Sequence, residues 1–275
     1  MGKLTGKVAV ITGAARGQGR SHALRLASEG ADIIALDVCE DIASTSYTGS
    51  TADDLAETAA EIEKLDRRVV TAKADVRNYE QLDTAIGKGV SELGRLDIVC
   101  ANAGILSMGQ LHDLTEDSWL EMIDINLNGV WRTTKAATPH LIESGGGGSI
   151  IITASGAALH GVQNIGHYVA AKTGVIGLMR TLSIELAPHR IRANAISPTN
   201  VNSDMIQNDA LYRLYLPHIE NPTREQFAEA VSTTHPMGIP WVEPADVSAV
   251  VAFLASDESR YITGMQVPIM AGRDC

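Results

Sequence analysis

The sequence has few cysteines, no long apolar run and no cluster of basic residues. Its 275 residues include three cysteines, an odd number without metal-ligand spacing, so we expect a reducing compartment, the cytoplasm, and no disulfide framework. No stretch approaches the ~18 consecutive apolar residues of a membrane span. The net charge of -11 argues against nucleic-acid binding, because neutralising phosphates requires a basic patch. We therefore predict a cytoplasmic protein with neither a membrane nor a nucleic acid as partner.

Common motifs of metal sites and hydrolases are also missing. The histidines and carboxylates do not show the spacing of metal ligands, so no metal is predicted. The stretch TASGA (153–157) differs from the G-x-S-x-G motif of hydrolases.

Apolar, β-branched runs instead alternate with segments of helical periodicity along the whole chain. Strands that are apolar on both faces and alternate with helices form parallel sheets covered on both sides. We therefore predict an α/β fold, a single-domain, doubly wound Rossmann-type sheet over residues 1–275 with seven strands. The expected strands are KVAVIT, DIIALDV, RVVTAKADV, LDIVCANAG, SIIITAS, IRANAIS and VPIMAG.

The stretch TGAARGQG (12–19) follows the first expected strand and begins a helix. In that context a glycine-rich turn brings backbone N–H groups and the positive helix end to a pyrophosphate. Gly13, Gly17 and Gly19 allow this close approach, and the same turn contains Arg16 and Gln18. An ordinary tight turn is the alternative, but the flanking strand and helix favour nucleotide binding.

Asp37 ends the next expected strand, about 20 residues beyond the glycines. A carboxylate there accepts hydrogen bonds from the adenosine ribose and repels a 2'-phosphate, so NAD is favoured over NADP as the cofactor. Two alternatives stay open: Arg16 could bind a 2'-phosphate, and Asp37 could cap a turn.

Tyr168 and Lys172 are four residues apart in a helical stretch, so their side chains project from one face. A nearby ammonium favours the phenolate and is expected to lower the pKa of the tyrosine. The phenol could then exchange a proton with an alcohol or a carbonyl group. Taken alone, such a pair is most often a surface coincidence.

Several motifs occur in a fixed order: TGAARGQG, NAG at 102–104, Asn126 in INLNG, Ser155 after SIIITA, and YVAAK beginning at Tyr168. In this combination the sequence resembles the short-chain dehydrogenase/reductase family over nearly its whole length. The resemblance implies an NAD-dependent oxidoreductase in which Tyr168 is the general acid/base and Ser155 polarises the substrate oxygen. It also implies that Lys172 holds the nicotinamide ribose and lowers the Tyr168 pKa, while Asn126 positions a water in a proton relay.

The resemblance places further residues against the adenine, the adenosine ribose and the nicotinamide end of the cofactor. They are, in that order, Asp75 and Val76; Asn102, Ala103 and Gly104; and Pro198, Val201 and Ser203. Thr199 replaces the glycine usual after Pro198, so the geometry of this loop is expected to differ from the family pattern. A homotetramer is a further implication of the resemblance.

Two segments interrupt the regular alternation, and long loops in compact domains tend to be functional or disordered. The stretches DIIALDVCEDIASTSYTGSTADDL and SPTNVNSDM resemble the mycofactocin-linked, carveol-dehydrogenase-like branch of the family. In that branch NAD is thought to stay bound and to be recycled in place by an external redox partner, mycofactocin. We therefore expect the inserted loop 39–52 to fold over the adenosine end and slow NAD release. A disordered surface loop is the alternative.

Residues 200–242 carry many apolar side chains and are expected to form a lid over an apolar substrate pocket. They favour a lipophilic secondary alcohol or its ketone, of terpenoid or alicyclic type, as the substrate. The expected substrate residues are Leu106, Leu159, His160, Met205 and Tyr212.

Three other functions stay open. A conventional dehydrogenase would exchange NAD freely, and a non-catalytic NAD-binding sensor would use the fold without the chemistry. An isomerase would use the same proton-transfer group with transient oxidation, and would be expected to carry an additional carboxy-terminal substrate domain.

Overall fold

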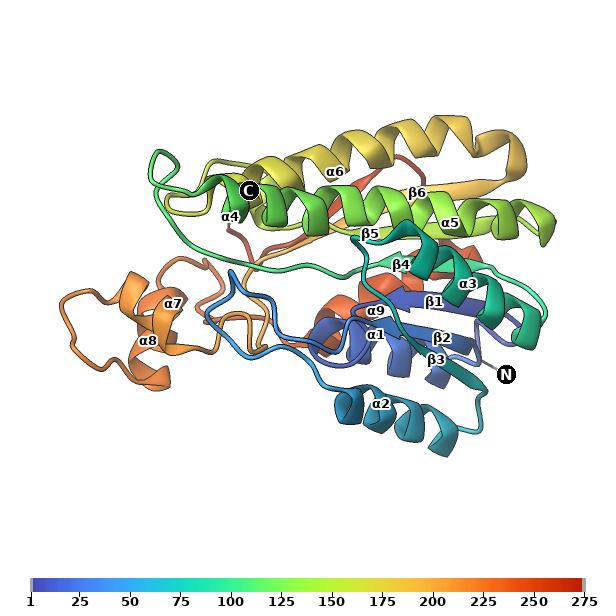
Figure 1. The fold of residues 1–275 in the computed structure, drawn as a ribbon, viewed down its shortest axis with the longest axis horizontal. Helices are drawn as coiled ribbons and strands as arrows, with labels where there is room; N and C mark the ends of the chain where they lie inside the picture. The colour runs from blue at the N-terminus through green and yellow to red at the C-terminus, as the bar shows by residue number, and fades with distance from the viewer. Residues whose placement is uncertain (1, 274–275) are drawn as a thin grey trace.

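The computed structural model describes residues 2–273, which form a seven-stranded sheet in the order β3-β2-β1-β4-β5-β6-β7 (Figure 1). Every neighbouring pair of strands is parallel. The predicted fold class and the predicted number of strands are therefore confirmed. The strands are β1 (Val8–Thr12), β2 (Asp32–Asp37), β3 (Val69–Lys73), β4 (Ile98–Ala101), β5 (Gly148–Thr153), β6 (Ile191–Pro198) and β7 (Gln266–Ile269).

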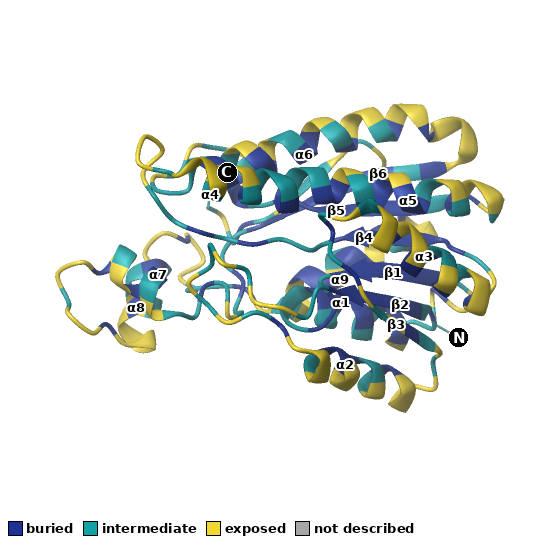
Figure 2. Ribbon diagram, viewed as in Figure 1, coloured by how far each residue is buried: buried dark blue, intermediate teal, exposed yellow. Residues whose placement is uncertain are grey.

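Helices cover both faces of the sheet, as Figure 2 shows by its buried strands and exposed outer helix surfaces. Successive side chains of a strand point to opposite faces. Thus Val8 and Val10 join the core shared with α3, α5 and α6, whereas Ala9 and Ile11 join the core shared with α1 and α9. The helices are α1 (Gly17–Ser28), α2 (Ala52–Lys64), α3 (Tyr79–Leu93), α4 (Glu116–Ile123), α5 (Gly129–Glu143), α6 (Gly166–Glu185), α7 (Asp209–Tyr215), α8 (Arg224–Ser232) and α9 (Pro244–Ala255).

Local sequence signals set several helix ends. Thr51 and Asp54 form a capping box that begins α2 directly after the inserted loop. Asn78 caps the start of α3, and Gly94 ends that helix in the left-handed region, with φ of 92°. The inserted loop thus lies between two fixed points, the end of β2 and the cap of α2.

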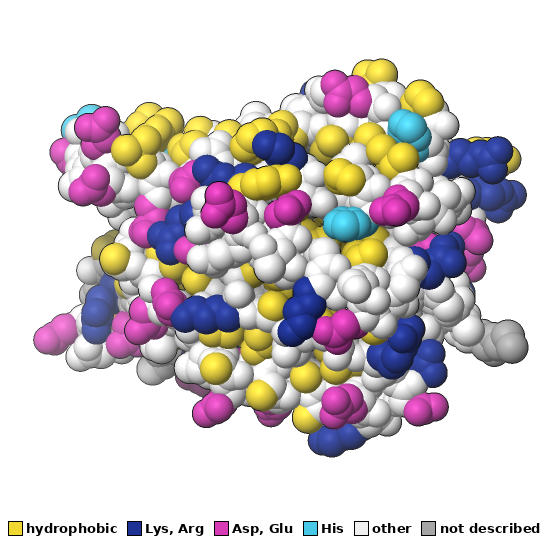
Figure 3. Space-filling model, turned by 45° about the vertical axis from the view of Figure 1, so that its right-hand side comes forward, with side chains coloured by type: hydrophobic (Ala, Val, Ile, Leu, Met, Phe, Trp, Pro, Cys, Tyr) yellow, Lys and Arg dark blue, Asp and Glu magenta, His cyan; other side chains and the backbone are white. Residues whose placement is uncertain are grey.

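The loops at the carboxyl ends of the strands gather at one edge of the sheet, where ligands bind in open α/β folds. Figure 1 shows α7 and α8 projecting beyond this edge. On the face drawn in Figure 3, basic and acidic side chains are interspersed with hydrophobic ones. No helix within residues 2–273 is long and apolar enough to cross a bilayer. The same residues contain no group of His, Cys, Asp or Glu side chains that could hold a metal ion.

Candidate active site

The turn between β1 and α1 brings the predicted glycines into close contact. A Cβ atom added to Gly19 would lie 1.8 Å from the carbonyl oxygen of Gly13, so a larger residue does not fit. The N-cap residue of α1, Arg16, makes no side-chain cap hydrogen bond. Backbone N–H groups at this helix end can therefore bind an anion such as a pyrophosphate.

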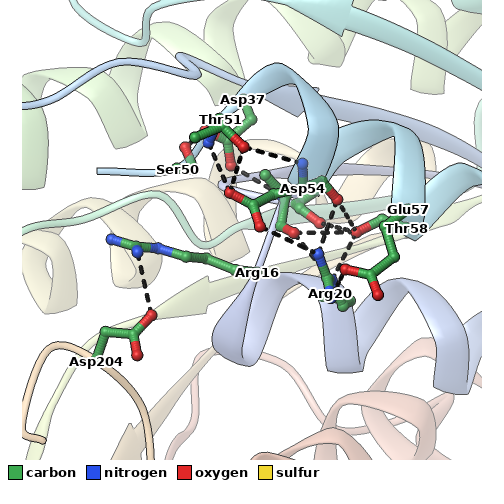
Figure 4. A network of polar contacts seen from close by, with 11 residues as sticks. Arg16, Arg20, Asp37, Ser50, Thr51, Asp54, Glu57, Thr58 and Asp204 are labelled. Carbon is green, nitrogen blue, oxygen red and sulfur yellow. Dashed lines mark hydrogen bonds and ion pairs between the residues drawn. The ribbon is translucent and has the colours of Figure 1, made fainter. Parts of the chain in front are cut away.

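Asp37 lies between this turn and the inserted loop (Figure 4). One carboxylate oxygen accepts a hydrogen bond from the N–H of Ala15 at 2.9 Å. The other accepts from the N–H of Cys39 at 3.1 Å and from the Ser50 hydroxyl at 2.6 Å. The buried carboxylate also borders a cavity shared with Gly13, which we call the nucleotide cavity. Asp37 thus links the glycine turn, through Ala15, to the inserted loop, through Cys39 and Ser50, and it also borders this cavity.

The guanidinium of Arg16 is held by protein acceptors. It forms an ion pair with Asp204 at 3.1 Å (Figure 4) and donates a hydrogen bond to the carbonyl of Thr48. Its cation also lies 5.9 Å from the centroid of the Tyr47 ring. Arg16 therefore links the glycine turn to the inserted loop and to the loop after β6, rather than standing as an unoccupied partner for a 2'-phosphate.

The inserted loop runs along the nucleotide cavity and contacts three other parts of the chain. The N–H of Ser44 donates to Glu121 at 3.2 Å, and the hydroxyl of Ser46 donates to Asn208 at 3.3 Å. Glu40 forms an ion pair with Lys73 of β3. The loop residues that border the cavity are Glu40, Ile42, Thr45, Tyr47, Gly49 and Ser50.

Asp75 and Val76, expected at the adenine, border the same cavity. Burial acts to raise the pKa of Asp75, but hydrogen bonds from Arg77 outweigh burial and hold the pKa below its ordinary value. Arg77 also pairs with Glu121 at 3.1 Å. The Asp75 carboxylate is therefore a fixed anion at this wall of the cavity.

The turn after β4 joins the nucleotide cavity to a second one, which we call the catalytic cavity. Asn102 and Gly104 border both cavities, and Ala103 borders the first. The Asn102 amide donates to the carbonyl of Thr12 at 3.0 Å and accepts from the hydroxyl of Thr153 at 3.2 Å. It therefore ties together the ends of β1, β4 and β5.

Ser155, Tyr168 and Lys172 meet at the catalytic cavity. Ser155 follows β5, while α6 carries both other residues, whose side chains are 9% and 3% exposed, respectively. The Lys172 ammonium lies 5.7 Å from the centroid of the Tyr168 ring and donates to the carbonyl of Thr153 at 2.8 Å. Ser155 also forms a side-chain hydrogen bond with Tyr168. The helical spacing thus gives a buried cluster rather than a surface coincidence.

Burial governs the acid–base properties of this cluster. It raises the pKa of Tyr168, and the hydrogen bond with Ser155 only partly offsets the effect. Burial also lowers the pKa of Lys172 to about 8, because it removes water from the ammonium. The expectation of a lowered Tyr168 pKa is therefore wrong in this structure, because desolvation of the buried phenol dominates the shift. A neutral phenol suits proton donation to a ketone.

Asn126 lies in a π-helical segment, Asp124–Asn128, between α4 and α5. Its side chain is fully buried and forms hydrogen bonds with both backbone polar groups of Ile105. Oδ1 accepts from the N–H of Ile105, and Nδ2 donates to the carbonyl of the same residue, each at 2.8 Å. A Cβ added to Gly104 would lie 3.0 Å from Asn126 Oδ1 and 3.3 Å from Lys172 Nζ. Asn126 therefore fixes the turn after β4, which lies against Lys172. Its Oδ1 has a second lone pair that can accept one more hydrogen bond.

The catalytic cavity has a volume of about 460 Å³. Three of the expected substrate residues, Leu106, His160 and Met205, border it, as do the expected cofactor residues Pro198, Val201 and Ser203. Leu159 and Tyr212 are not among its lining residues. Leu159, which follows a 3-10 turn, is 45% exposed, and Tyr212 packs on Phe227 with ring centroids 4.7 Å apart.

Residues 200–242 contain a small aromatic cluster of their own. Phe227 is fully buried and has Tyr212, Tyr215 and Trp241 around it, with ring centroids 4.7 to 6.2 Å away. Tyr215 is the member that also borders the catalytic cavity. This cluster gives the segment a packed aromatic base beside the cavity.

Sequence reasoning missed several residues at these cavities. Asn200, Met270 and Arg273 border the catalytic cavity, and Tyr47 borders the nucleotide cavity. The signal for Tyr47 was a lone aromatic residue in a Ser/Thr-rich loop. The other three lie beyond the ends of β6 and β7, where strand order brings distant loops together.

Comparisons with known proteins agree with this geometry. The family profile described as short chain dehydrogenase matches residues 7–211. The (-)-trans-carveol dehydrogenase of Rhodococcus erythropolis is 54% identical over 273 residues, which cover 99% of each chain. The crystal structure of carveol dehydrogenase from Mycobacterium avium in complex with NAD is 53% identical, with a TM-score of 0.98 over 99% of each chain. A short chain dehydrogenase from Mycobacterium paratuberculosis bound to NAD is 40% identical, with a TM-score of 0.90 over 98% of each chain. The protein therefore belongs to the short chain dehydrogenase family.

Proposed function

We propose that the protein is an NAD-dependent alcohol dehydrogenase that interconverts a lipophilic secondary alcohol and its ketone. The observation that carries this proposal is the meeting of Ser155, Tyr168 and Lys172 at a cavity that adjoins the glycine turn. Relatives solved with NAD support the choice of cofactor. The 54% identity to a carveol dehydrogenase supports a carveol-like, alicyclic substrate.

The residues of the nucleotide cavity fit NAD. The contact between Gly19 and Gly13 leaves the uncapped start of α1 open to a pyrophosphate, and the Asp37 carboxylate can accept hydrogen bonds from ribose hydroxyls. When bound, NAD supplies the hydride acceptor, and the positive charge of its oxidised ring favours the phenolate form of Tyr168.

The chain itself must orient the substrate and move one proton. In alcohol oxidation, Tyr168 accepts the hydroxyl proton while hydride leaves the carbinol carbon; in ketone reduction it returns the proton to oxygen. Ser155 donates a hydrogen bond to the same oxygen and orients it. Lys172 would hold ribose hydroxyls of the cofactor, while Asn126 positions the adjoining turn and would offer its Oδ1 as an acceptor to a relay water.

We further propose that NAD stays bound during turnover and that an external redox partner of the mycofactocin type reoxidises it. The support is the set of hydrogen bonds that the inserted loop forms. The Ser50 hydroxyl donates to Asp37, and the Thr48 carbonyl accepts from Arg16. The Ser46 hydroxyl donates to Asn208, which lies in the expected lid segment 200–242. A loop fastened at several points must break several hydrogen bonds before the cofactor can leave.

One experiment tests both parts of the function. The freshly purified protein is denatured and its nicotinamide cofactor is quantified by mass spectrometry, while a second sample is incubated with labelled NAD. Stoichiometric NAD that resists replacement, together with oxidation of carveol in the presence of an artificial electron acceptor, is the expected result. Rapid replacement with normal oxidation would instead indicate a conventional dehydrogenase, and NAD binding without turnover of any alcohol would indicate a sensor.

We also propose a homotetramer. Trp131 on α5 and Ile184 on α6 are 46% and 75% exposed, and Phe253 on α9 is 39% exposed. Exposed apolar side chains on two separate faces support two different subunit contacts. Light scattering that gives the mass of a monomer at micromolar concentration would contradict this assembly.

A further inference from the structure

Thr199 follows β6 directly, at the position where the family pattern has a glycine, and it borders the catalytic cavity. Its backbone lies outside the left-handed region, so this turn has no need of a glycine. The Thr199 hydroxyl lies 2.7 Å from Nε2 of His235, a buried residue 36 positions further along the chain. The residue that departs from the family pattern thus makes a long-range contact through its side chain.

The other nitrogen of the His235 ring shows which atom donates in this contact. Nδ1 lies 3.3 Å from the carbonyl oxygen of Val231, and a carbonyl oxygen only accepts, so Nδ1 carries the hydrogen. The Thr234 hydroxyl, 3.4 Å from Nδ1, donates its own proton to the same carbonyl. In the neutral ring Nε2 is then the acceptor, and the Thr199 hydroxyl donates to it.

His235 connects the end of the sheet with the helices α7 and α8. Val231, whose carbonyl the ring contacts, lies on α8 and belongs to the same buried cluster as Leu211 of α7. Leu211 borders the catalytic cavity, as do its neighbours Leu214 and Tyr215. The two helices, which project beyond the sheet in Figure 1, thus form a packed unit whose α7 side is a wall of the cavity.

Backbone contacts place the same pair of residues beside the end of β7. The N–H of Thr199 donates to the carbonyl of Ile269 at 3.0 Å. The N–H of Met237, two residues after His235, donates to the carbonyl of Ala271 at 3.2 Å. Thr199 and His235 therefore meet where the ends of β6, β7 and α8 come together.

We propose that Thr199 and His235 are a positioning pair that sets the alcohol-binding wall of the catalytic cavity. Their hydrogen bond holds α8, and through it α7, against the ends of β6 and β7. The pair acts through Leu211, Leu214 and Tyr215, and it favours an alcohol whose apolar body is large enough to reach them. This inference rests on the proposed function in taking that wall as the binding face for an alcohol.

Three substitutions isolate the hydroxyl of Thr199. Thr199→Val removes the donor and keeps the shape, whereas Thr199→Ser keeps the donor. Thr233→Val is the matched control, because Thr233 is exposed at the end of α8 and its hydroxyl donates to the carbonyl of Ala230 in the same helix. Single-turnover rates of protein carrying NAD are measured over a range of carveol concentrations, which separates alcohol binding from the chemical step and from product release.

We expect Thr199→Val to raise the half-saturating concentration of carveol about three- to tenfold, the effect of one net hydrogen bond. The maximal rate and the NAD content should stay within about twofold, because the pair does not touch the reacting atoms. Thr199→Ser should restore the low half-saturating concentration, and Thr233→Val should leave it unchanged.

Replacement of the acceptor provides an independent check. His235→Phe should raise the half-saturating concentration by a similar factor, and adding Thr199→Val to it should produce no further rise, because both substitutions remove the same bond. If His235→Phe does not fold, the contrast between valine and serine at position 199 still decides the question.

Amide hydrogen exchange, followed by mass spectrometry, tests the same bond without turnover. Thr199→Val should speed exchange in residues 209–232 about three- to tenfold, whereas Thr199→Ser should not. Failure of the unaltered protein to oxidise carveol would contradict the proposed substrate, while the exchange result would still judge the pair.

Three outcomes would overturn the inference. They are a rise of equal size in Thr199→Val and Thr199→Ser, an unchanged half-saturating concentration or exchange rate in Thr199→Val, and a fall confined to the maximal rate or the NAD content. The last of these would place the effect of Thr199 on the chemical step or the cofactor instead of the alcohol-binding wall.

Discussion

The hydroxyl of Tyr47 accepts a hydrogen bond from the backbone N–H of Leu106 at 3.1 Å. Tyr47 belongs to the inserted loop and borders the nucleotide cavity, whereas Leu106 borders the catalytic cavity. Burial raises the pKa of Tyr47 to about 12, so the hydroxyl stays protonated over the physiological pH range. The inserted loop is thus fastened to the segment that follows β4 and borders both cavities.

This contact predicts that Tyr47→Phe speeds NAD release. The substitution keeps the ring beside Arg16 and removes only the hydroxyl, so the expected increase in the off-rate is about three- to tenfold, the effect of one net hydrogen bond. The measurement is the loss of labelled NAD from the protein after dilution. Tyr261→Phe is the matched control, because Tyr261 is 89% exposed. An equal off-rate in both variants would contradict retention by the loop.

Lys172→Met should make the protein more stable and inactive. The pKa of Lys172 falls from an ordinary 10.5 to about 8, which corresponds to a cost on the order of 3 kcal/mol for keeping its charge buried. A methionine of similar length removes that charge. We expect a higher midpoint of chemical denaturation at pH 7, measured by fluorescence, together with loss of turnover.

The pH dependence of that gain follows from proton linkage. Between pH 8 and 10.5 the unfolded chain keeps a proton on Lys172 that the folded protein has released, so the unaltered protein gains stability as pH rises. The advantage of Lys172→Met should therefore be largest below pH 8 and disappear by about pH 10.5. A constant advantage across this window would show that packing rather than charge is responsible.

His22 should destabilise the folded protein in acid. Its Nδ1 lies 2.8 Å from the hydroxyl of Ser248, which donates its own proton to the carbonyl of Pro244, so Nδ1 carries the hydrogen. Burial lowers the pKa of His22 to about 3, from an ordinary 6.5. As pH falls from 6.5 toward 3, the unfolded chain takes up a proton that the folded protein does not, and stability declines.

The corresponding variant is His22→Gln, which stays neutral at every pH. Between pH 6 and 4 the unaltered protein should lose about 1 kcal/mol more stability per pH unit than this variant, as measured by urea denaturation. His189→Gln is the control, because His189 is exposed. Parallel pH profiles for the unaltered protein and His22→Gln would contradict a neutral, buried His22.

Phe227→Leu should affect substrate binding more than chemistry. Phe227 is fully buried at the centre of the aromatic cluster and does not border the catalytic cavity. Loosening this base should raise the KM for a lipophilic alcohol several-fold and change kcat by less than about twofold. A selective fall in kcat would show that the segment acts on the chemical step instead.

Local patterns were enough to predict the sheet and the grouping of the catalytic motifs. The alternation of apolar strands with helices gives parallel order, and parallel order brings the carboxyl ends of β1, β4 and β5 together. Tyr168 and Lys172 share a face because of helical spacing alone. These features depend on the periodicity of short segments, which a sequence displays directly.

Properties that depend on distant parts of the chain could not be predicted in the same way. Helical spacing suggested that Lys172 lowers the Tyr168 pKa, but the sign of the shift is set by how much water the whole fold excludes. The π-helical turn at Asn126 resembles ordinary helix in sequence. Tyr212 looked like a lid residue, yet it packs on Phe227, fifteen residues further along the chain.

The most direct test of the proposed dehydrogenase is one turnover on bound NAD. Protein carrying stoichiometric NAD is mixed with carveol, and the absorbance of reduced nicotinamide is followed, for the unaltered protein and for Tyr168→Phe. We expect a rapid rise of about one equivalent in the unaltered protein and a rate at least ~10²-fold lower in Tyr168→Phe, with NAD content unchanged. Equal rates in both proteins would contradict the role of Tyr168 as the acid/base.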